Sequence, residues 1–346
     1  MITSLRSRCG IADYSRTLVH ALRHRVEIPV YCEPAAFDPA QNGLDAIHLQ
    51  HQYFLYGGVA PWKNTFRRFA DRLSAPTVMT VHEYVEPTGD PLRRLAIAWT
   101  NRTQFRNRHI DGLITHTNLD RERLIRLGVG AERIHVVPHF VPPAPALPSR
   151  EEARSALGIG GSFVITIPGF LSRRKGHPAA IRAMAQMPSC ARLFLAGGAH
   201  PDDRSQYADS LVQLAIQHGV AERVTVTGYL EDADMATIMA ATDVILAPFT
   251  SGSGSGSLAL AFACGKPIVA SAIAPNIEID SRTPGALYLV PPEDPNSIAR
   301  AIDSLMQDGE ALARLSARAS EYAAQMTVVS VAQETADVLR RIAIVR

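Results

Sequence analysis

The sequence predicts an α/β protein made of two doubly wound, Rossmann-like domains. Its 346 residues exceed the usual size of one domain. Short apolar runs alternate with amphipathic stretches along nearly the whole chain, which is the pattern of parallel sheets with helices on both faces. Five prolines crowd residues 138–148, and because proline continues neither a ladder nor a helix interior, this segment is the expected linker. The expected domains are residues 1–143 and 144–327.

In the first domain, the apolar runs predict strands and the stretches between them predict helices. The expected strands are 2–5, which is very short, 46–51, 77–82, 112–117 and 134–138. The expected helices start at about Tyr14 and span 62–74, 92–109 and 119–127.

The second domain repeats the pattern. A helix is expected to restart at Ser149, because Ser149 and Glu152 have the spacing of a capping box. The expected strands are 163–168, 191–196, 224–228, 243–248, 267–271 and 286–290. Residues 258–264 predict a helix, and the chain ends in two long helical patterns at 296–326 and 328–344.

Composition excludes several classes of protein. A hydrophobic content of 47% excludes a disordered chain, and no apolar run reaches the roughly 18 residues of a membrane span. A net charge of +2 gives no indication of nucleic-acid binding, and residues 1–10 lack a signal-peptide layout. The four cysteines are scattered, which argues against a zinc site or disulfides and suits the cytoplasm.

Ligands of doubly wound sheets bind at the carboxyl ends of strands, so each strand-to-helix junction is a candidate site. We expect the two domains to face each other across a central cleft.

One strand-to-helix junction is the serine-glycine run 251–257. Glycines admit a ligand close to the backbone, and the first turn of a helix offers unpaired N–H groups that bind anions. The expected ligand is therefore a diphosphate. The alternative is a flexible surface loop. The candidate residues are Gly254, Ser255, Gly256 and Ser257.

The same run fits the dinucleotide pattern G-x-G-x-x-A through Gly254, Gly256 and Ala259. The next strand ends in Ser-Ala-Ile, with no carboxylate for a ribose, which disfavours a nicotinamide oxidoreductase. Asp232 and Asp234 have the spacing of a metal-binding pair. They begin a helical pattern, where the dipole alone favours acids, so no metal site is predicted.

A second junction, residues 169–176, is basic. Arg173, Arg174 and Lys175 follow the strand that ends before Gly169. Only three of the 35 lysine and arginine residues are lysines, and a lysine is a compact charge suited to a phosphate oxygen. The alternative is a solvated basic turn.

The first domain offers Gly10 and four histidines at strand ends. Gly10 precedes the first helix, where a ligand could approach the backbone. Its alternative is an ordinary tight turn. The histidines are His51, His82, His116 and His139. A lone histidine is more often structural than functional, but four at the carboxyl ends of one sheet favour a site. His82 is the first candidate, because an open junction follows it.

Taken in order, these motifs resemble the bacterial glycosyltransferases of family 4, and the resemblance covers nearly the whole chain. Its pieces are CGIADY at 9–14, IHLQH at 47–51, VHE at 81–83, IHVVPH at 134–139, the loop 169–176, LAGG at 195–198, VTGYL at 226–230 and ACGKPIVAS at 263–271. The resemblance implies the two-domain GT-B fold, with a final helix at about 328–346 that packs back on the first domain.

The resemblance also implies an activity. A hexosyl residue would pass from a nucleotide-sugar donor on the second domain to an acceptor hydroxyl on the first, with retention of configuration and without a metal or other cofactor. Lys175 would contact the diphosphate with Arg173, Gly10 would belong to the donor-binding residues, and His82 would lie near the donor sugar. Gly169 would line the donor site, and Tyr229 and Leu230 would lie near the nucleobase.

The chain departs from the family at several positions. Phe170 replaces a frequent arginine, and Gly252 and Leu260 replace two glutamates that usually contact the donor sugar and the ribose. A glycosyltransferase fold that binds sugar nucleotides or serves a partner without catalysis therefore stays open, as does a sugar-nucleotide epimerase using Asp13 or Glu83. The short first strand leaves open a start upstream.

The acceptor side carries one further pattern. Residues 91–108 contain no acid and combine five arginines with Leu92, Leu95, Trp99 and Phe105. With Lys63, Arg67, Arg68 and Arg72 nearby in the sequence, this predicts a basic, aromatic face for the inner, anionic surface of the membrane. Such contact would suit a lipid-linked glycan acceptor in cell-surface polysaccharide assembly. The alternative is an ordinary amphipathic helix with a wet arginine face.

Overall fold

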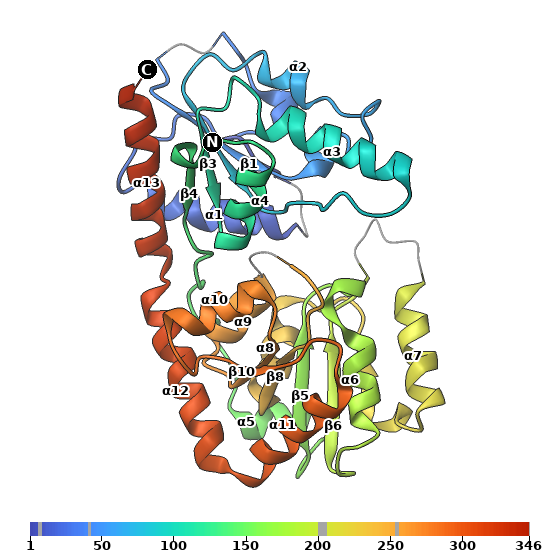
Figure 1. The fold of residues 1–346 in the computed structure, drawn as a ribbon. Helices are drawn as coiled ribbons and strands as arrows, with labels where there is room; N and C mark the ends of the chain where they lie inside the picture. The colour runs from blue at the N-terminus through green and yellow to red at the C-terminus, as the bar shows by residue number, and fades with distance from the viewer. Residues whose placement is uncertain (6–8, 41–42, 200–205, 253–255, 346) are drawn as a thin grey trace. The chain divides into compact units, whose positions relative to one another are not determined.

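A computed structural model describes residues 1–5, 9–40, 43–199, 206–252 and 256–345. The chain forms two compact units (Figure 1). Unit 1 comprises Met1–Phe140 and Met326–Arg346, and unit 2 comprises Val141–Gln325. Each unit is built on a parallel sheet, so the predicted fold class is confirmed.

The sheet of unit 1 has four strands in the order β1-β2-β3-β4. β1 and β2 are buried along their whole length, which explains their continuous apolar and uncharged sequences. The strands are β1 (Ile47–His51), β2 (Thr77–Val81), β3 (Gly112–Thr115) and β4 (Ile134–Val136).

The predicted strand 2–5 is reduced to a bridge. Ile2 pairs in parallel with both Cys32 and Leu49, which places it beside β1. Leu5 already leaves the sheet, because its backbone N–H donates to the Glu33 carboxylate at 3.0 Å.

The helices of unit 1 differ from the prediction at two places. α1 begins at Gly10, earlier than Tyr14, and Asp13 in its first turn suits the helix dipole. The predicted helix 62–74 shrinks to five residues, because the Asn64 side chain accepts from Phe66 N at 3.0 Å and donates to Gly58 O, which holds a turn before the helix. The helices are α1 (Gly10–Leu22), α2 (Phe66–Ala70), α3 (Pro91–Phe105), α4 (Asn118–Arg126) and α13 (Val328–Val345).

The last helix belongs to the core of unit 1. α13 packs on α1, and the two share a buried cluster. From α13 come Val331, Ala332, Ala336, Val338 and Leu339, and from α1 come Tyr14, Leu18, Ala21 and Leu22.

Unit 2 has a six-stranded sheet in the order β10-β9-β8-β5-β6-β7. Numbered within the unit, this is the 3-2-1-4-5-6 order of a dinucleotide-type fold, and its switch point lies between β5 and β8. The strands are β5 (Phe163–Pro168), β6 (Ala191–Ala196), β7 (Val224–Val226), β8 (Val244–Ala247), β9 (Ile268–Ser271) and β10 (Tyr288–Val290).

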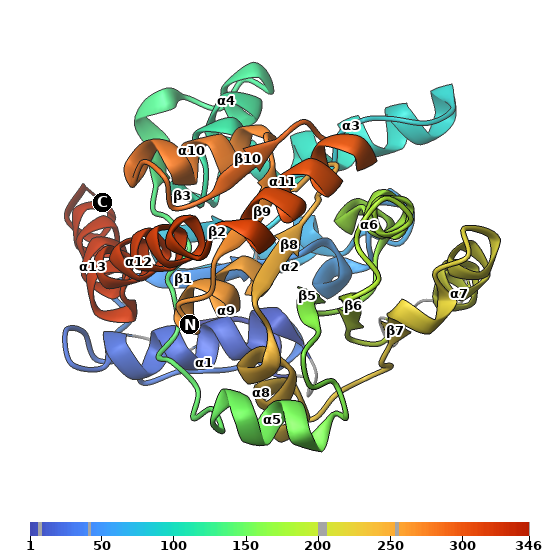
Figure 2. The ribbon, with the colours of Figure 1, turned by 90° about the horizontal axis from the view of Figure 1, so that it is seen from below.

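Helices cover both faces of this sheet (Figure 2). α6 (His177–Met184), α7 (Tyr207–Gln217) and α11 (Pro295–Gln307) share one core cluster with β5 residues Ile165 and Ile167. On the other face, α5 and α8 pack against Val164. The remaining helices are α5 (Arg150–Ala156), α8 (Asp232–Ala241), α9 (Gly256–Ala263), α10 (Ala274–Arg282) and α12 (Gly309–Gln325).

Local signals explain where two of these helices start. The predicted capping box is confirmed, since Glu152 N donates to Ser149 Oγ and Ser149 N donates to the Glu152 carboxylate. The predicted pattern 296–326 is two helices, because Asp308 turns the chain and its carboxylate accepts from Ala311 N at 2.9 Å. In the described parts of the chain, no helix is both long and apolar enough to span a bilayer.

Candidate functional site

In unit 2, three predicted residues come together at the switch point. Lys175 lies in the single turn of Arg173–Lys175 that follows β5, and Ser257 lies in the first turn of α9, which follows β8. Lys175 Nζ donates to Ser257 Oγ at 2.8 Å and to Pro168 O at 2.5 Å. The side chain therefore joins the ends of the two central strands. We call Gly169, Lys175 and Ser257 the lysine cradle.

Two glycines allow this close approach. Gly169 has φ +88°, and a Cβ there would lie 2.6 Å from Ser257 Oγ and 2.7 Å from Lys175 Nζ. Gly176 has φ +67°, and its Cβ would lie 1.8 Å from Pro248 O. Any side chain at Gly169 would push into the space that the lysine and serine occupy, so this position requires glycine.

Burial changes the charge state of the lysine. Desolvation, with the nearby Arg174 cation, lowers the pKa of Lys175 from 10.5 to about 7. The ammonium therefore sits among neutral oxygen partners and is only partly charged at neutral pH. An anion bound beside it would restore the charge, and this makes the lysine cradle suited to a phosphate group.

The other predicted donor residues of unit 2 fall in different places. The Arg173 guanidinium lies over the Tyr207 ring, 5.1 Å from its centre, and so points to a different partner than Lys175. Tyr229 is 43% exposed, with its ring 6.4 Å from that of Phe170. Leu230 is half-buried and packs against the core cluster of α5 and α8.

The serine-glycine loop is described only in part. Gly254 and Ser255 lie outside the described residues. Gly256 begins α9 and is exposed, and a Cβ there meets no described atom within 4 Å. A Cβ at Gly252 likewise lies more than 4 Å from every described atom outside its chain neighbours.

A further glycine pair was not predicted as part of the site. A Cβ at Gly197 would lie 2.4 Å from Gly169 O, and one at Gly198 would lie 2.7 Å from Tyr229 N. Leu171 N also donates to Gly198 O at 2.8 Å. The pair thus lets the segments that follow β5, β6 and β7 approach one another. Its signal in the sequence was two glycines directly after a strand.

In unit 1, His82 follows β2 and joins a chain of hydrogen bonds. Its Nε2 lies 2.7 Å from Gln50 Oε1, and its Nδ1 lies 3.3 Å from His116 Nε2. His116 Nδ1 in turn lies 3.0 Å from Val137 O. The Tyr14 ring packs edge-on against both imidazoles, with centroids 4.9 and 5.5 Å away. We call His82, His116, Gln50 and Tyr14 the histidine cluster.

The number of available protons limits how the hydrogen bonds of the histidine cluster can be arranged. Val137 O and Gln50 Oε1 only accept, so each outer nitrogen must carry a hydrogen. Two neutral rings have no hydrogen left for the contact between them, and a third proton would make the pair cationic. Burial and the neighbouring histidines hold the pKa of His82 well below its usual range and lower that of His116 to about 3. The neutral pair is therefore favoured, with Gln50 Oε1 facing His82 and Gln50 Nε2 facing His48.

The remaining candidate residues of unit 1 lie in different surroundings. His139 adjoins the histidine cluster, with its ring 5.4 Å from that of His116. His51 is fully buried among aromatic rings and bonds Gln104 at 2.8 Å, so its role is structural. Gly10 is exposed, and a Cβ there meets no atom of the described residues within 4 Å. Packing against the described residues therefore does not require glycine at this position.

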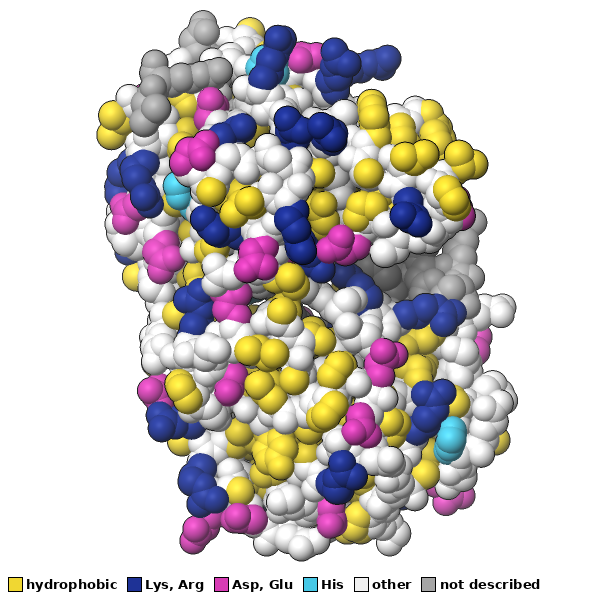
Figure 3. Space-filling view, in the orientation of Figure 1, with side chains coloured by type: hydrophobic (Ala, Val, Ile, Leu, Met, Phe, Trp, Pro, Cys, Tyr) yellow, Lys and Arg dark blue, Asp and Glu magenta, His cyan; other side chains and the backbone are white. Residues whose placement is uncertain are grey.

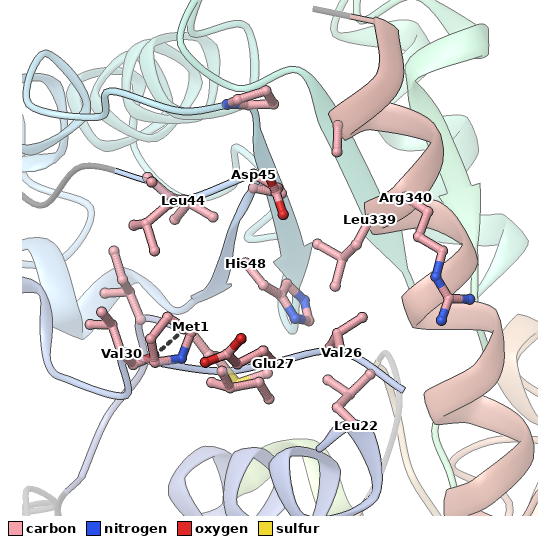
Figure 4. Close-up of a pocket in the computed structure, with 18 of the residues that line it drawn as sticks. Met1, Leu22, Val26, Glu27, Val30, Leu44, Asp45, His48, Leu339 and Arg340 are labelled. Carbon is pink, nitrogen blue, oxygen red and sulfur yellow. Dashed lines mark hydrogen bonds between the residues drawn. The ribbon is translucent and has the colours of Figure 1, made fainter. Parts of the chain in front are cut away.

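Unit 1 also contains a cavity of about 1050 Å³ (Figure 4). Its wall includes His48 on β1, Leu339 and Arg340 on α13, and Met1, whose amino group donates to Val30 O at 2.6 Å. Residues that precede or begin β1 and β2, among them Ala46 and Pro76, also line it. The cavity therefore lies at the amino ends of these strands, and His48 in its wall is 3.2 Å (Nε2 to Nε2) from Gln50 of the histidine cluster.

Both halves of the chain match glycosyltransferase family models. Residues 13–144 match the model described as Glycosyltransferase Family 4, and residues 162–308 match the model described as Glycosyl transferases group 1. A D-inositol 3-phosphate glycosyltransferase of Xylanimonas cellulosilytica is 30% identical over 78% of this chain and 66% of its own length. The same enzyme of Mycobacterium sp. strain KMS is 34% identical over 60% of this chain and 47% of its own. The chain thus spans between about half and two thirds of these relatives.

Solved structures share the fold. Anabaena Alr3699/HepE in complex with UDP and glucose superposes with a TM-score of 0.71 at 20% identity, over 96% of this chain and 82% of that one. WaaG, a glycosyltransferase involved in lipopolysaccharide biosynthesis, gives 0.69 at 16% identity, over 95% and 96%. The chain therefore has the GT-B fold and carries a Glycosyltransferase Family 4 region followed by a Glycosyl transferases group 1 region.

Proposed function

We propose that this protein is a retaining hexosyltransferase that moves a sugar from a nucleotide-sugar donor to an acceptor hydroxyl. The observation that carries the proposal is the lysine cradle, at the switch point where ligands of such sheets bind. The family matches and the relatives' names support the same reaction class. Anabaena HepE, which shares the fold, was solved with UDP and with UDP-glucose.

Departure of a nucleoside diphosphate requires stabilisation of negative charge. Lys175 supplies a cation next to the open first turn of α9, where the N–H groups of Gly256 and Ser257 have no partner within the helix. Preorganised donors of this kind are commonly the largest catalytic contribution. Arg173 would assist by turning from Tyr207 toward the phosphates.

The histidine cluster supplies a different chemistry. Neutral imidazoles both donate and accept, which suits sugar hydroxyls, so His82 positions the donor sugar rather than attacking it. The acceptor hydroxyl would attack on the face from which the diphosphate leaves, and a phosphate oxygen would take its proton. We propose that no metal is required, which predicts unchanged activity in EDTA.

The proposed acceptor is a glycan or lipid-linked glycan in cell-surface polysaccharide or glycoconjugate assembly. Such acceptors are handled at the inner face of the membrane, so we propose a cytoplasmic protein with peripheral membrane contact.

The test starts from a thermal-shift screen of UDP-, GDP-, ADP- and dTDP-sugars, followed by release of the nucleoside diphosphate. Lys175→Ala should raise the activation free energy of turnover by about 3 kcal/mol, the loss expected for one such donor. Ser257→Ala should lower it less, because the backbone N–H remains. Arg300→Ala, which removes an exposed cation of α11, is the control. Turnover of Lys175→Ala close to wild type would contradict the assignment.

A second candidate is a subunit that binds sugar nucleotides without transferring the sugar. Gly252 and Leu260, which replace the family's two glutamates, favour it. Calorimetric binding of a sugar nucleotide without turnover would distinguish this function from the first.

A further inference from the structure

The outward face of α3 carries an apolar stripe that the described residues of unit 1 leave exposed. Leu92 and Leu95 are 80% and 69% exposed, and Trp99 is 47% exposed. Their spacing of three and four residues places them on one side of the helix. The opposite side is buried through Ile97 and Phe105, so Phe105 belongs to the core and not to the predicted face.

A second exposed aromatic residue lies in the segment before α2. Trp62 is 81% exposed, and its segment is tied to α3 by a hydrogen bond from Thr100 Oγ1 to Val59 O at 2.8 Å. Hydrophobic side chains gather over this part of unit 1 (Figure 3). Contiguous apolar patches of this kind mark interaction sites more often than scattered apolar residues do. We call Trp62, Leu92, Leu95 and Trp99 the α3 surface.

The sequence around the α3 surface is rich in exposed cations and poor in acids. Residues 91–108 contain no acid. Of the nearest acids, Asp90 caps α3 through Arg93 N, Asp71 lies 3.3 Å from the His109 ring, and Glu86 pairs with Arg123. The exposed cations are Lys63, Arg67, Arg68, Arg93, Arg94, Arg102, Arg106 and Arg108.

We propose that the α3 surface docks on an anionic lipid bilayer. Leucine and tryptophan would enter the boundary between head groups and acyl chains, and the arginines would reach the lipid phosphates. The inference names the surface for the membrane contact proposed above, but its observations do not depend on glycosyl transfer.

Charge decides between a bilayer and a second copy of the chain. Two-fold pairing of this face would bring one set of arginines against another, which opposes association. An anionic surface neutralises the same arginines. The chemistry of the face therefore fits lipid phosphates.

The chain offers an internal probe for the test. Its only two tryptophans, Trp62 and Trp99, are both on the α3 surface. Vesicles of phosphatidylcholine with phosphatidylglycerol should shift the tryptophan emission to shorter wavelength and carry the protein in flotation. Vesicles of phosphatidylcholine alone should do neither, and added salt should weaken binding, since the screening length is about 10 Å at 0.1 M. Trp62→Phe and Trp99→Phe should each retain part of the shift.

Variants separate the two components of the surface. Arg102→Gln with Arg106→Gln, which follow Trp99 by three and seven residues and so share its side of the helical spacing, should weaken vesicle binding by about fivefold for each arginine. Leu92→Ser with Leu95→Ser should weaken it by about tenfold or more. The matched control, Ile216→Ser on α7 with Arg300→Gln on α11, should bind as wild type does. All variants should keep the wild-type melting temperature and nucleotide affinity, which separates this test from that of the proposed function.

Three results would overturn the proposal. One is the absence of any emission shift and flotation with anionic vesicles. Another is equal binding to neutral and anionic vesicles, which would leave the arginines without a role. The third is an emission shift that follows protein concentration without lipid, because the occupant would then be a second copy.

Discussion

The two candidate sites hold polar groups in opposite ways. In unit 1, the histidine cluster buries imidazoles that are neutral at physiological pH, because burial and mutual proximity lower their pKa. In unit 2, the lysine cradle buries one cation whose pKa is lowered only to about 7. One site thus offers neutral donors and acceptors, and the other offers a charge that depends on what is bound.

The difference fits the two kinds of group in a glycosyl transfer. Sugar hydroxyls need directional hydrogen bonds, whereas a leaving diphosphate needs positive charge. A permanent charge in the unit 1 site would add little to the binding of a neutral sugar hydroxyl. A neutral unit 2 site could not stabilise the leaving group. Each prediction below changes one side of this comparison.

The largest expected effect is selective acid unfolding of unit 1. Burial lowers the pKa values of His48, His51 and His116 from 6.5 to about 3, 4 and 3. These pKa values are lower in the folded state than in the unfolded state, so the neutral histidines contribute fully to stability above pH 6.5. The free energy of unfolding then falls as the pH decreases toward 3. At about pH 5, three such groups cost about 6 kcal/mol together. In unit 2 only His177 has a similar shift among the described histidines.

Pulsed hydrogen exchange resolved by peptide measures this difference, because it follows the backbone amides of each unit separately. During acid titration, unit 1 should lose protection at a higher pH than unit 2. His48→Gln, which keeps a donor for Thr80 but cannot take up a proton, should move the midpoint for unit 1 to lower pH. Loss of protection at the same pH in both units would contradict the comparison.

A second prediction concerns the charge of the lysine cradle. A bound diphosphate should raise the pKa of Lys175 above its free value of about 7, so binding takes up a proton. Nucleotide affinity should therefore fall by up to about tenfold for each pH unit above 7. Calorimetry in buffers of different ionisation enthalpy measures this uptake. Lys175→Arg, charged throughout, should bind with no such slope; an unchanged slope would assign the titration to another group.

The smallest expected effect comes from restoring a carboxylate. A Cβ at Gly252 meets no described atom within 4 Å, so Gly252→Glu is the substitution that tests the position of the family's first glutamate. One added hydrogen bond to the donor sugar should strengthen sugar-nucleotide binding by about 1 kcal/mol and leave the free nucleoside diphosphate unchanged. Gly256→Glu, the matched control, places the same charge at the first turn of α9 and should weaken both ligands. Equal effects of the two substitutions would show that charge alone matters.

The fold was predictable because parallel strands buried on both faces leave continuous apolar runs, such as 77–81 and 163–168. The errors arose where a polar side chain decides the backbone. Asn64 shortens α2, and Asp308 divides α11 from α12.

The site was predictable at the level of junctions, but not at the level of partners. Lys175 and Ser257 lie 82 residues apart, and only the adjacency of β5 and β8 brings them together. Likewise, Gln50 gave no signal of its own, because its contact with His82 depends on the register of β1 against β2. Sequence patterns identify the ends of strands, whereas strand order determines which ends meet.

The position of α13 has a consequence for biosynthesis. Unit 2 is one continuous segment, Val141–Gln325, whereas unit 1 needs residues that are translated after unit 2. Until α13 is translated, the buried cluster of unit 1 lacks Val331, Ala332 and Ala336, so the apolar face of α1 stays uncovered. Domains fold as units during synthesis. Unit 2 should therefore be complete on the ribosome first, and the earliest part of the chain should be the last to become protease-resistant.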